Sequence, residues 1–126
     1  MDQNSLQAAC FALHSALYNS LVEVDTNLTQ VICQISTQLA STKDSVRSLD
    51  SYVRHFYIFS SDELIEEPSD FYISACIALE YQNQVLENLE TFHQQLVCLK
   101  QVVSFQISTS ISTWHQVRAD AGFNFN

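Results

Sequence analysis

The sequence is almost free of glycine and proline. Its 126 residues contain one of each, Gly122 and Pro68. Sandwiches, barrels and doubly wound sheets need frequent turns, and turns draw on Gly, Pro, Asn and Asp for their backbone angles. Glycine-dependent phosphate and dinucleotide loops are excluded for the same reason, and neither HExxH nor a nucleophile elbow occurs. We therefore expect no sheet fold, no enzyme and no cofactor.

Charged residues are also scarce, and few of them are basic. They make up 15% of the chain, with 5 Lys and Arg against 14 Asp and Glu, for a formal net charge of -9. Nucleic-acid binders concentrate Lys and Arg against phosphates, and proteins that bind anionic membrane surfaces also need clustered positive charge. We expect neither as a partner. Ser, Thr, Gln and Asn fill most polar positions, which indicates that protein covers more of the surface than in a solvated coiled coil.

Long apolar runs are missing as well. The patch around Ala8–Leu13 has no basic residues before it, and His14 and Ser15 interrupt it. These features are typical of neither a signal peptide nor a membrane span, so we expect a cytoplasmic or nuclear protein without membrane insertion. The four cysteines have no CxxC spacing and are expected to be reduced thiols; they are Cys10, Cys33, Cys76 and Cys98.

Apolar residues at helical spacing are abundant in the first half of the chain. Steps of three and four alternate, as one face of a helix requires, and two consecutive fours around Ile35 predict a stutter. The spacing predicts a helix over about 4–57. A break at Ser41, whose spacing to Asp44 resembles a capping arrangement, is the alternative; the lack of Gly and Pro favours continuity. The apolar face comprises Leu17, Leu21, Val24, Leu28, Val31, Ile35, Leu39, Thr42, Val46, Leu49, Val53 and Phe56.

A second helix is predicted over about 70–117. Pro68 stops any helix that begins in the acidic hinge 58–70, and Ser69 or Asp70 supplies the cap. Beyond Val103 apolar residues also alternate with period two, so a strand is the alternative to the favoured helix over 103–114. The tail 118–126 is expected to fray. The face of this helix comprises Phe71, Ala75, Ala78, Gln82, Val85, Leu89, Phe92, Leu96, Leu99 and Val103.

Two long helices joined by a short hinge fold back as an antiparallel pair, which predicts a single all-α domain over 1–126. Many apolar residues lie off both faces, and burying each is worth about 1.5–3 kcal/mol. We therefore expect a coiled-coil hairpin that packs into a multi-helix bundle with partner helices, unless a break at Ser41 gives a compact four-helix bundle. The expected partner-binding residues are Leu17, Leu21, Val24, Leu28, Val31, Ile35, Leu39, Val46, Leu49, Val53, Phe71, Ile73, Ile77, Val85, Leu89, Phe92, Leu96, Leu99 and Val103.

Two polar groups have a chemical interpretation beside a plain structural one. Cys10 and His14 lie one helical turn apart and face His115 in a hairpin, so the three residues suit zinc or copper. Without a fixed fourth ligand they are better explained as a thiol and two surface imidazoles. We therefore predict no metal site. The acidic hinge is expected to be a solvated loop; a docking point for a basic partner or a weak divalent-ion site is the alternative. Its carboxylates are Asp62, Glu63, Glu66, Glu67 and Asp70.

The chain resembles the coiled-coil hairpin of a central-channel FG nucleoporin in three features. These are the apolar spacing over about 28–103, the helix start Pro68-Ser69-Asp70-Phe71 and the run Leu89 to Lys100. That resemblance implies a structural segment that assembles with other channel nucleoporins, although the chain has no Phe-Gly dipeptide. The sequence thus favours a non-enzymatic scaffold subunit that binds other coiled-coil proteins, itself, or both. A compact adaptor or inhibitor that captures a partner helix and a metal-binding bundle are the alternatives.

Overall fold

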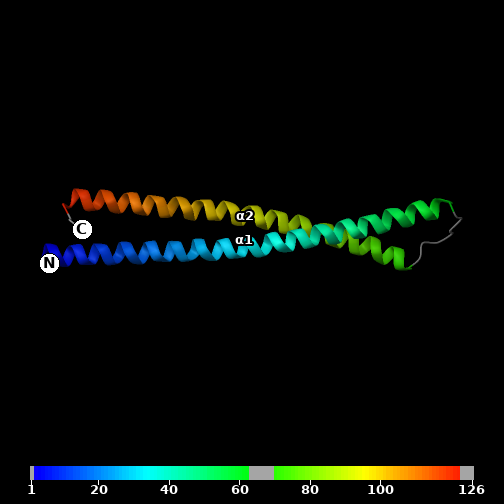
Figure 1. Ribbon diagram of the computed structural model, residues 1–126, viewed down its shortest axis with the longest axis horizontal. Helices are drawn as coiled ribbons and strands as arrows, with labels where there is room; N and C mark the ends of the chain where they lie inside the picture. The colour runs from blue at the N-terminus through cyan, green and yellow to red at the C-terminus, as the bar shows by residue number, and fades with distance from the viewer. Residues whose placement is uncertain (1, 63–69, 123–126) are drawn as a thin grey trace. The chain divides into compact units, whose positions relative to one another are not determined.

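The chain is an all-α helical hairpin, as the sequence predicts. The computed structural model describes the backbone of residues 2–62 and 70–122 and the side chains of residues 2–56 and 70–122. It contains two helices, α1 (Gln3–Asp62) and α2 (Asp70–Asp120), labelled in Figure 1. No strand occurs in the described ranges, so residues 103–114 are helix and not strand. Helix α1 passes Ser41 without a break, because no residue there interrupts its backbone hydrogen bonds.

The helix ends follow from local chemistry. At the start of α1 the Ser5 backbone N–H donates to Asp2 Oδ1 over 2.7 Å, which makes Asp2 the N-cap. Helix α1 extends five residues beyond its expected end at residue 57, because neither Gly nor Pro occurs before Pro68. Beyond Asp120, Gly122 takes a positive φ of 71° and its N–H donates to the Ala119 carbonyl over 3.2 Å. Such left-handed glycines commonly end helices.

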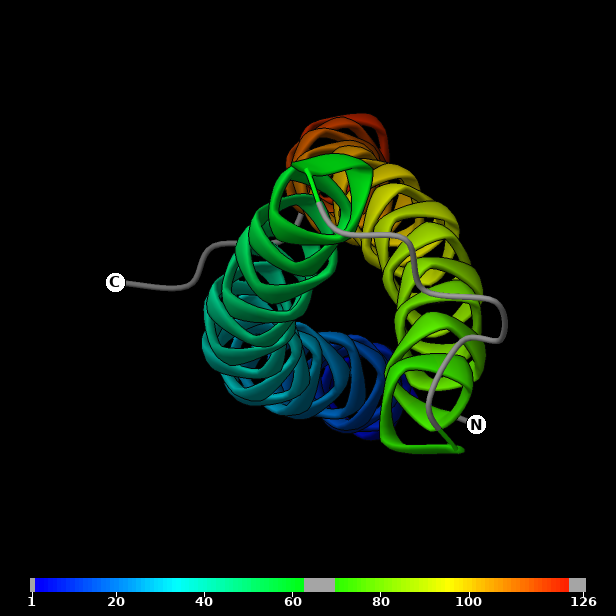
Figure 2. The ribbon, with the colours of Figure 1, turned by 90° about the vertical axis from the view of Figure 1, so that its right-hand side faces the viewer.

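Contacts group the residues into two units. Unit 1 comprises Met1–Ile32 and Leu96–Asn126, and unit 2 comprises Cys33–Gln95. Unit 1 is an antiparallel helix pair, since His14 stacks on Trp114 and Asp25 pairs with Lys100. Unit 2 is another, since Phe56 stacks on Tyr72 while Ser36 contacts His93. Figure 2 looks onto the end of unit 2 where α1 finishes and α2 begins.

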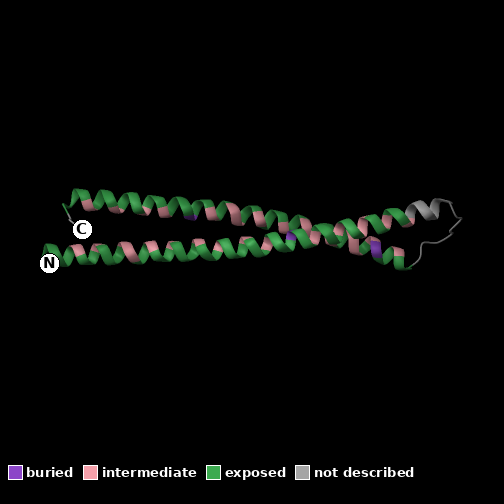
Figure 3. Cartoon of the chain, viewed as in Figure 1, coloured by how far each residue is buried: buried purple, intermediate pink, exposed green. Residues whose placement is uncertain are grey.

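Very few side chains in either unit are buried. Among the described residues only Val103 in unit 1, and Leu39 and Ala75 in unit 2, fall in the buried class, and no large side chain is fully buried. Figure 3 shows these as isolated purple positions, with half-buried positions recurring in pink between exposed green ones. A helix pair therefore forms a contact seam in each unit without enclosing a core.

The seam of unit 1 contains polar residues that the apolar pattern did not identify. The sequence places Leu17, Val24 and Val31 in the seam, whereas the half-buried residues are Tyr18, Asp25 and Ile32, each one position later. Leu21, Leu28 and Ile35 belong to both series. Steps of three and four therefore alternate from Tyr18 to Phe56 without the stutter predicted around Ile35. The inward positions of unit 1 are Gln7, Cys10, His14, Tyr18, Leu21, Asp25, Leu28 and Ile32 on α1, and Leu96, Lys100, Val103, Ile107, Ser110 and Trp114 on α2.

The seam of unit 2 shows the same one-position shift on α2. Tyr72, Leu79 and His93 point inward, whereas Phe71 and Phe92 are exposed. Ala78 and Val85 are half-buried beside the seam. The remaining inward positions are Ile35, Leu39, Thr42, Val46, Leu49, Val53 and Phe56 on α1, and Ala75, Gln82, Leu86 and Leu89 on α2.

Candidate protein-binding face

Unit 1 carries a row of exposed apolar side chains along one side of its seam. Val24 and Leu99 each precede a charged seam residue by one position, and they are 44% and 48% exposed. We define the apolar side of unit 1 as Leu17, Val24 and Val31 on α1 with Leu99, Val102 and Phe105 on α2; all six are exposed.

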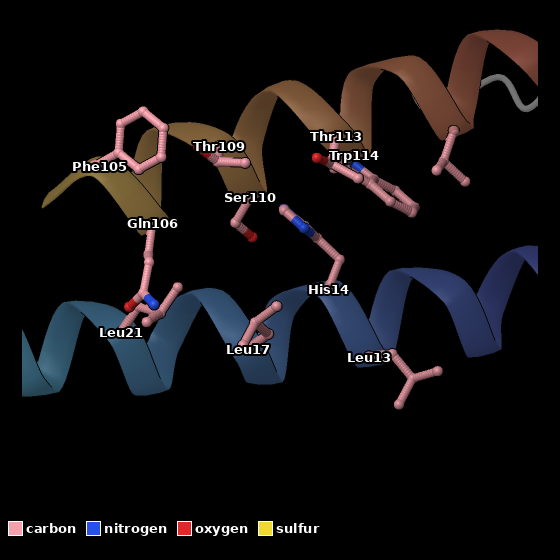
Figure 4. Close-up of a pocket in the computed structure, with 11 residues that line it drawn as sticks. Leu13, His14, Leu17, Leu21, Phe105, Gln106, Thr109, Ser110, Thr113 and Trp114 are labelled. Atoms are coloured by element: carbon pink, nitrogen blue, oxygen red, sulfur yellow. The ribbon is translucent and has the colours of Figure 1, made fainter. Parts of the chain in front are cut away.

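A groove shows that both helices contribute to the same side. Leu13 and Leu17 of α1 line it together with Phe105, Thr109 and Thr113 of α2, and its volume is about 560 Å³. In Figure 4 these side chains lie along the two facing ribbons, with His14 extending from α1 toward α2. The other lining residues are Leu21, Gln106, Ser110, Trp114 and Val117. None of the eleven carries a carboxylate, ammonium or guanidinium group, so the groove suits an apolar or neutral polar occupant.

Aromatic rings cluster around His14 and Trp114, two of the residues that line the groove. His14 stacks on Trp114 with ring centroids 4.8 Å apart and an interplanar angle of 11°. Phe11 lies on the same tryptophan at 6.3 Å and 59°, and Tyr18 stacks on His14 at 6.2 Å. Such contacts add about 0.5–1.5 kcal/mol each beyond area burial. They hold the sole tryptophan of the chain at the groove wall.

An ion pair fixes the register of the two helices in unit 1. Lys100 Nζ donates to Asp25 Oδ1 over 2.8 Å, and the two side chains are 34% and 28% exposed. Ser104 Oγ donates weakly to the same oxygen at 3.5 Å. Because a charged group in a seam tolerates few registers, this pair determines which residues of α1 and α2 lie opposite each other. The sequence pattern placed Val24 and Leu99 in the seam instead of Asp25 and Lys100, because these apolar neighbours also fit the helical spacing.

Unit 2 has an aromatic side of its own. Tyr52 and Phe71, which each precede a seam residue by one position, meet edge to face with centroids 5.5 Å apart. Tyr81 and Phe92 continue this side at 66% and 45% exposure. A polar depression occurs there too, lined by Ser41, Asp44, Ser45, Ser48, Leu49 and Gln82.

The expected partner-binding residues separate into two groups. One group faces the opposite helix or lies half-buried beside it: Leu21, Leu28, Ile35, Leu39, Val46, Leu49, Val53, Val85, Leu89, Leu96 and Val103. The other group is exposed and remains open to a partner: Leu17, Val24, Val31, Phe71, Ile73, Ile77, Phe92 and Leu99. Several exposed apolar residues are absent from the expected partner-binding set, notably Leu13, Tyr52, Tyr81 and Phe105.

The other sequence expectations have simpler outcomes. Cys10 is half-buried, His14 lies against Trp114 and His115 is exposed. Among the described residues, no three His, Cys, Asp or Glu are placed to hold a metal ion. All four cysteines are free thiols. Residues 63–69 of the acidic hinge and the side chain of Asp62 lie outside the described residues, while Asp70 is exposed. No helix in the described part of the chain is both long and apolar enough to cross a membrane.

The fold and this face define the chain as an all-α hairpin with an incompletely buried apolar surface. No protein-family model matches the sequence, and neither a curated protein nor a solved structure is similar to it. Its function must therefore be inferred from its own residues.

Proposed function

We propose that the chain is a non-enzymatic coiled-coil subunit that joins a larger assembly by packing the apolar side of unit 1 against helices of other protein chains. The supporting observation is the imbalance within unit 1. Twelve of its large apolar side chains are exposed, whereas Val103 is its single buried one among the described residues. Burying such side chains is worth about 1.5–3 kcal/mol each when complete, so association recovers free energy that the hairpin alone leaves unused.

The polar composition of the face supports a protein partner. Gln106, Thr109 and Thr113 line the groove beside the apolar side chains, and uncharged groups of this kind can form hydrogen bonds across an interface without desolvating a charge. A scaffold of the nuclear-pore type, to which the spacing over about 28–103 bears a resemblance, is one assembly that such a subunit suits. An intracellular location accords with this proposal.

The groove also favours a second candidate, an adaptor that captures one amphipathic helix of a partner. Its lining of Leu13, Leu17, Phe105 and Val117 offers apolar contacts from both helices, as grooves that bind single helices do. The two functions differ in what is bound. An assembly subunit contacts helices of several chains, whereas an adaptor contacts one peptide segment.

Photo-crosslinking in the source cells tests the proposal. A photoreactive amino acid replaces Val24, on the apolar side, or Val22, which follows seam residue Leu21 and lies on the opposite side of α1. Their exposures, 44% and 37%, are similar. We expect residue 24 to crosslink to discrete protein chains identified by mass spectrometry, and residue 22 to give far fewer products. Equal labelling from both positions, or none from residue 24, contradicts the proposal.

A further inference from the structure

The end of α2 has the geometry of a Schellman turn. Gly122 has a φ of 71°, and its N–H donates to the Ala119 carbonyl over 3.2 Å. One residue earlier, the Ala121 N–H still donates to the Val117 carbonyl in the helical pattern. A left-handed glycine just beyond a helix that donates to the carbonyl three residues back belongs to this turn. The turn also commonly brings the residue after the glycine against a side chain five or six positions back.

Val117 offers an apolar contact to the residue that follows this turn. That residue is Phe123, and the helix positions five and six residues before it are Arg118 and Val117. Val117 is apolar and 43% exposed. A phenyl ring on Val117 removes apolar surface of both residues from water without desolvating a charge. The local geometry and chemistry therefore favour a contact of Phe123 with Val117.

Val117 also belongs to the groove of unit 1. Among the lining residues it is the one nearest to the end of α2, and Leu13 and Trp114 line the groove with it. Leu13 is 73% exposed. We define the groove end as Leu13, Trp114 and Val117, of which Figure 4 labels the first two. A side chain that packs on Val117 therefore covers part of the groove end.

The length of the segment after Gly122 limits what it can cover. Residues 123–126 lie outside the described residues, and four residues span at most about 14 Å when fully extended. Phe105, the first residue of α2 in the groove, lies about 25 Å from Gly122 along the helix axis, at about 1.5 Å per residue. These four residues cannot reach Phe105, so that part of the groove stays open to a partner.

We propose that Phe123 packs on Val117 and covers the groove end, so that a partner helix must displace it to bind along the whole groove. The contact follows from the turn at Gly122. Its role as a competitor rests on the proposed function, which places partner helices on this side of unit 1. A contact within one chain forms without the loss of translational freedom that association costs, and it persists until partner contacts replace it.

NMR of the purified full chain tests the contact. Nuclear Overhauser effects should connect the Phe123 ring with the Val117 methyl groups, whose chemical shifts the ring also perturbs. Phe123→Ala should abolish these effects and move the methyl shifts. The matched control Phe125→Ala, which removes a ring two residues further on, should leave both unchanged. Trp114 is present in all three proteins, so it does not account for a difference between them. A wild type without these Overhauser effects, or equal responses to the two substitutions, overturns the inference.

Photo-crosslinking in the source cells tests the competition. A photoreactive amino acid replaces Leu13 at the groove end, and the yield of crosslinks to other proteins is compared with and without Phe123→Ala. If Phe123 covers the groove end for at least half of the time, its removal raises the apparent affinity for a partner there at least about twofold. We expect the crosslink yield to rise accordingly, and Phe125→Ala to leave it unchanged.

The outcomes separate this inference from the proposed function. If residue 24 captures other proteins but Phe123→Ala does not change the yield at residue 13, the competition is overturned and the proposed function stands. If neither position captures a protein, the proposed function and the competition both fail. The Overhauser effects then decide independently whether Phe123 covers the groove end.

Discussion

Individual residues determine which side of each helix is left uncovered. In unit 1, Asp25 and Lys100 occupy seam positions that Val24 and Leu99 would otherwise fill, and the two apolar residues lie outside as a result. A half-exposed ion pair contributes little free energy, about 0–1 kcal/mol. Its effect is on register, since sliding either helix along the other with the same face inward would leave a charge in the seam without its partner.

Truncating a seam leucine should cost more stability than truncating an exposed one. Leu39 is 9% exposed and Leu17 is 54% exposed. We expect Leu39→Ala to lower the free energy of unfolding by about 2–3 kcal/mol, because it removes packed atoms and leaves a cavity, and Leu17→Ala to change it by less than about 0.5 kcal/mol. Urea titrations of both variants and the wild type at one protein concentration, followed by circular dichroism, provide the comparison. Equal losses would show that the seam is misplaced.

The N-cap of α1 should depend on pH. The Ser5 backbone N–H that donates to Asp2 lowers the pKa of this carboxyl below its ordinary value of 3.8. A lowered pKa means that the ionised cap stabilises the first turn at pH values above 3.8, and that this stabilisation is lost as pH falls through the lowered pKa.

We therefore expect the Ser5 amide and the Cα shifts of residues 3–6, followed by NMR, to report fraying below that pH. The Asp2→Asn variant keeps a capping oxygen without a titrating group. It should show no such transition, and an identical pH profile in both proteins would exclude the cap as its cause.

At the scale of helices, the sequence predicted the two helices but not which face of each helix contacts the other. One Gly and one Pro leave little besides two long helices, and Leu39 and Val103 were placed correctly because both the apolar face and the seam contain them. The predicted seam contained Val24 and Val31, whereas the observed seam contains the residues that follow them. A pattern of apolar residues does not identify a seam that includes Asp25. The pairing of Asp25 with Lys100 depends on how α1 and α2 align, which is a tertiary property.

The aromatic cluster was not identified for the same reason. Cys10, His14 and His115 form an apparent ligand set in sequence, but the neighbour of His14 across the seam is Trp114, one residue away from His115. A shift of one residue rotates a helical side chain by about 100°. Candidate sites formed by two helices are therefore sensitive to register, whereas element boundaries are not.

The continuity of α1 at Ser41 is testable through the difference between two substitutions. Ser41 is exposed and helical. Proline there removes a backbone hydrogen bond and clashes with the preceding turn, so we expect Ser41→Pro to lower the free energy of unfolding by about 3 kcal/mol and to reduce the helical circular dichroism signal. Ser41→Ala should leave stability unchanged or raise it by less than about 0.5 kcal/mol. A harmless proline would indicate that α1 breaks near residue 41.

For the whole molecule, composition is the basis on which we expect partners. A chain with 47% hydrophobic and 15% charged residues is too apolar for a helix pair, which covers one stripe of each helix and leaves the other exposed. Composition alone predicts association, and the exposed apolar residues of unit 1 form the side that we propose as its site. The identity of a partner could not be read from the sequence, because it depends on the surfaces of other chains.

The position of the apolar side depends on Asp25 and Lys100 facing each other in the seam, because this arrangement places Leu17, Val24 and Val31 outside it. Exchanging the two charges tests it most directly, by thermal and urea unfolding of four proteins at one concentration. We predict that Asp25→Lys and Lys100→Asp each lower the free energy of unfolding by about 1–2 kcal/mol, and that the double variant recovers most of that loss. Two neutral single variants, or a double variant as unstable as the sum of both, would contradict the register and the face derived from it.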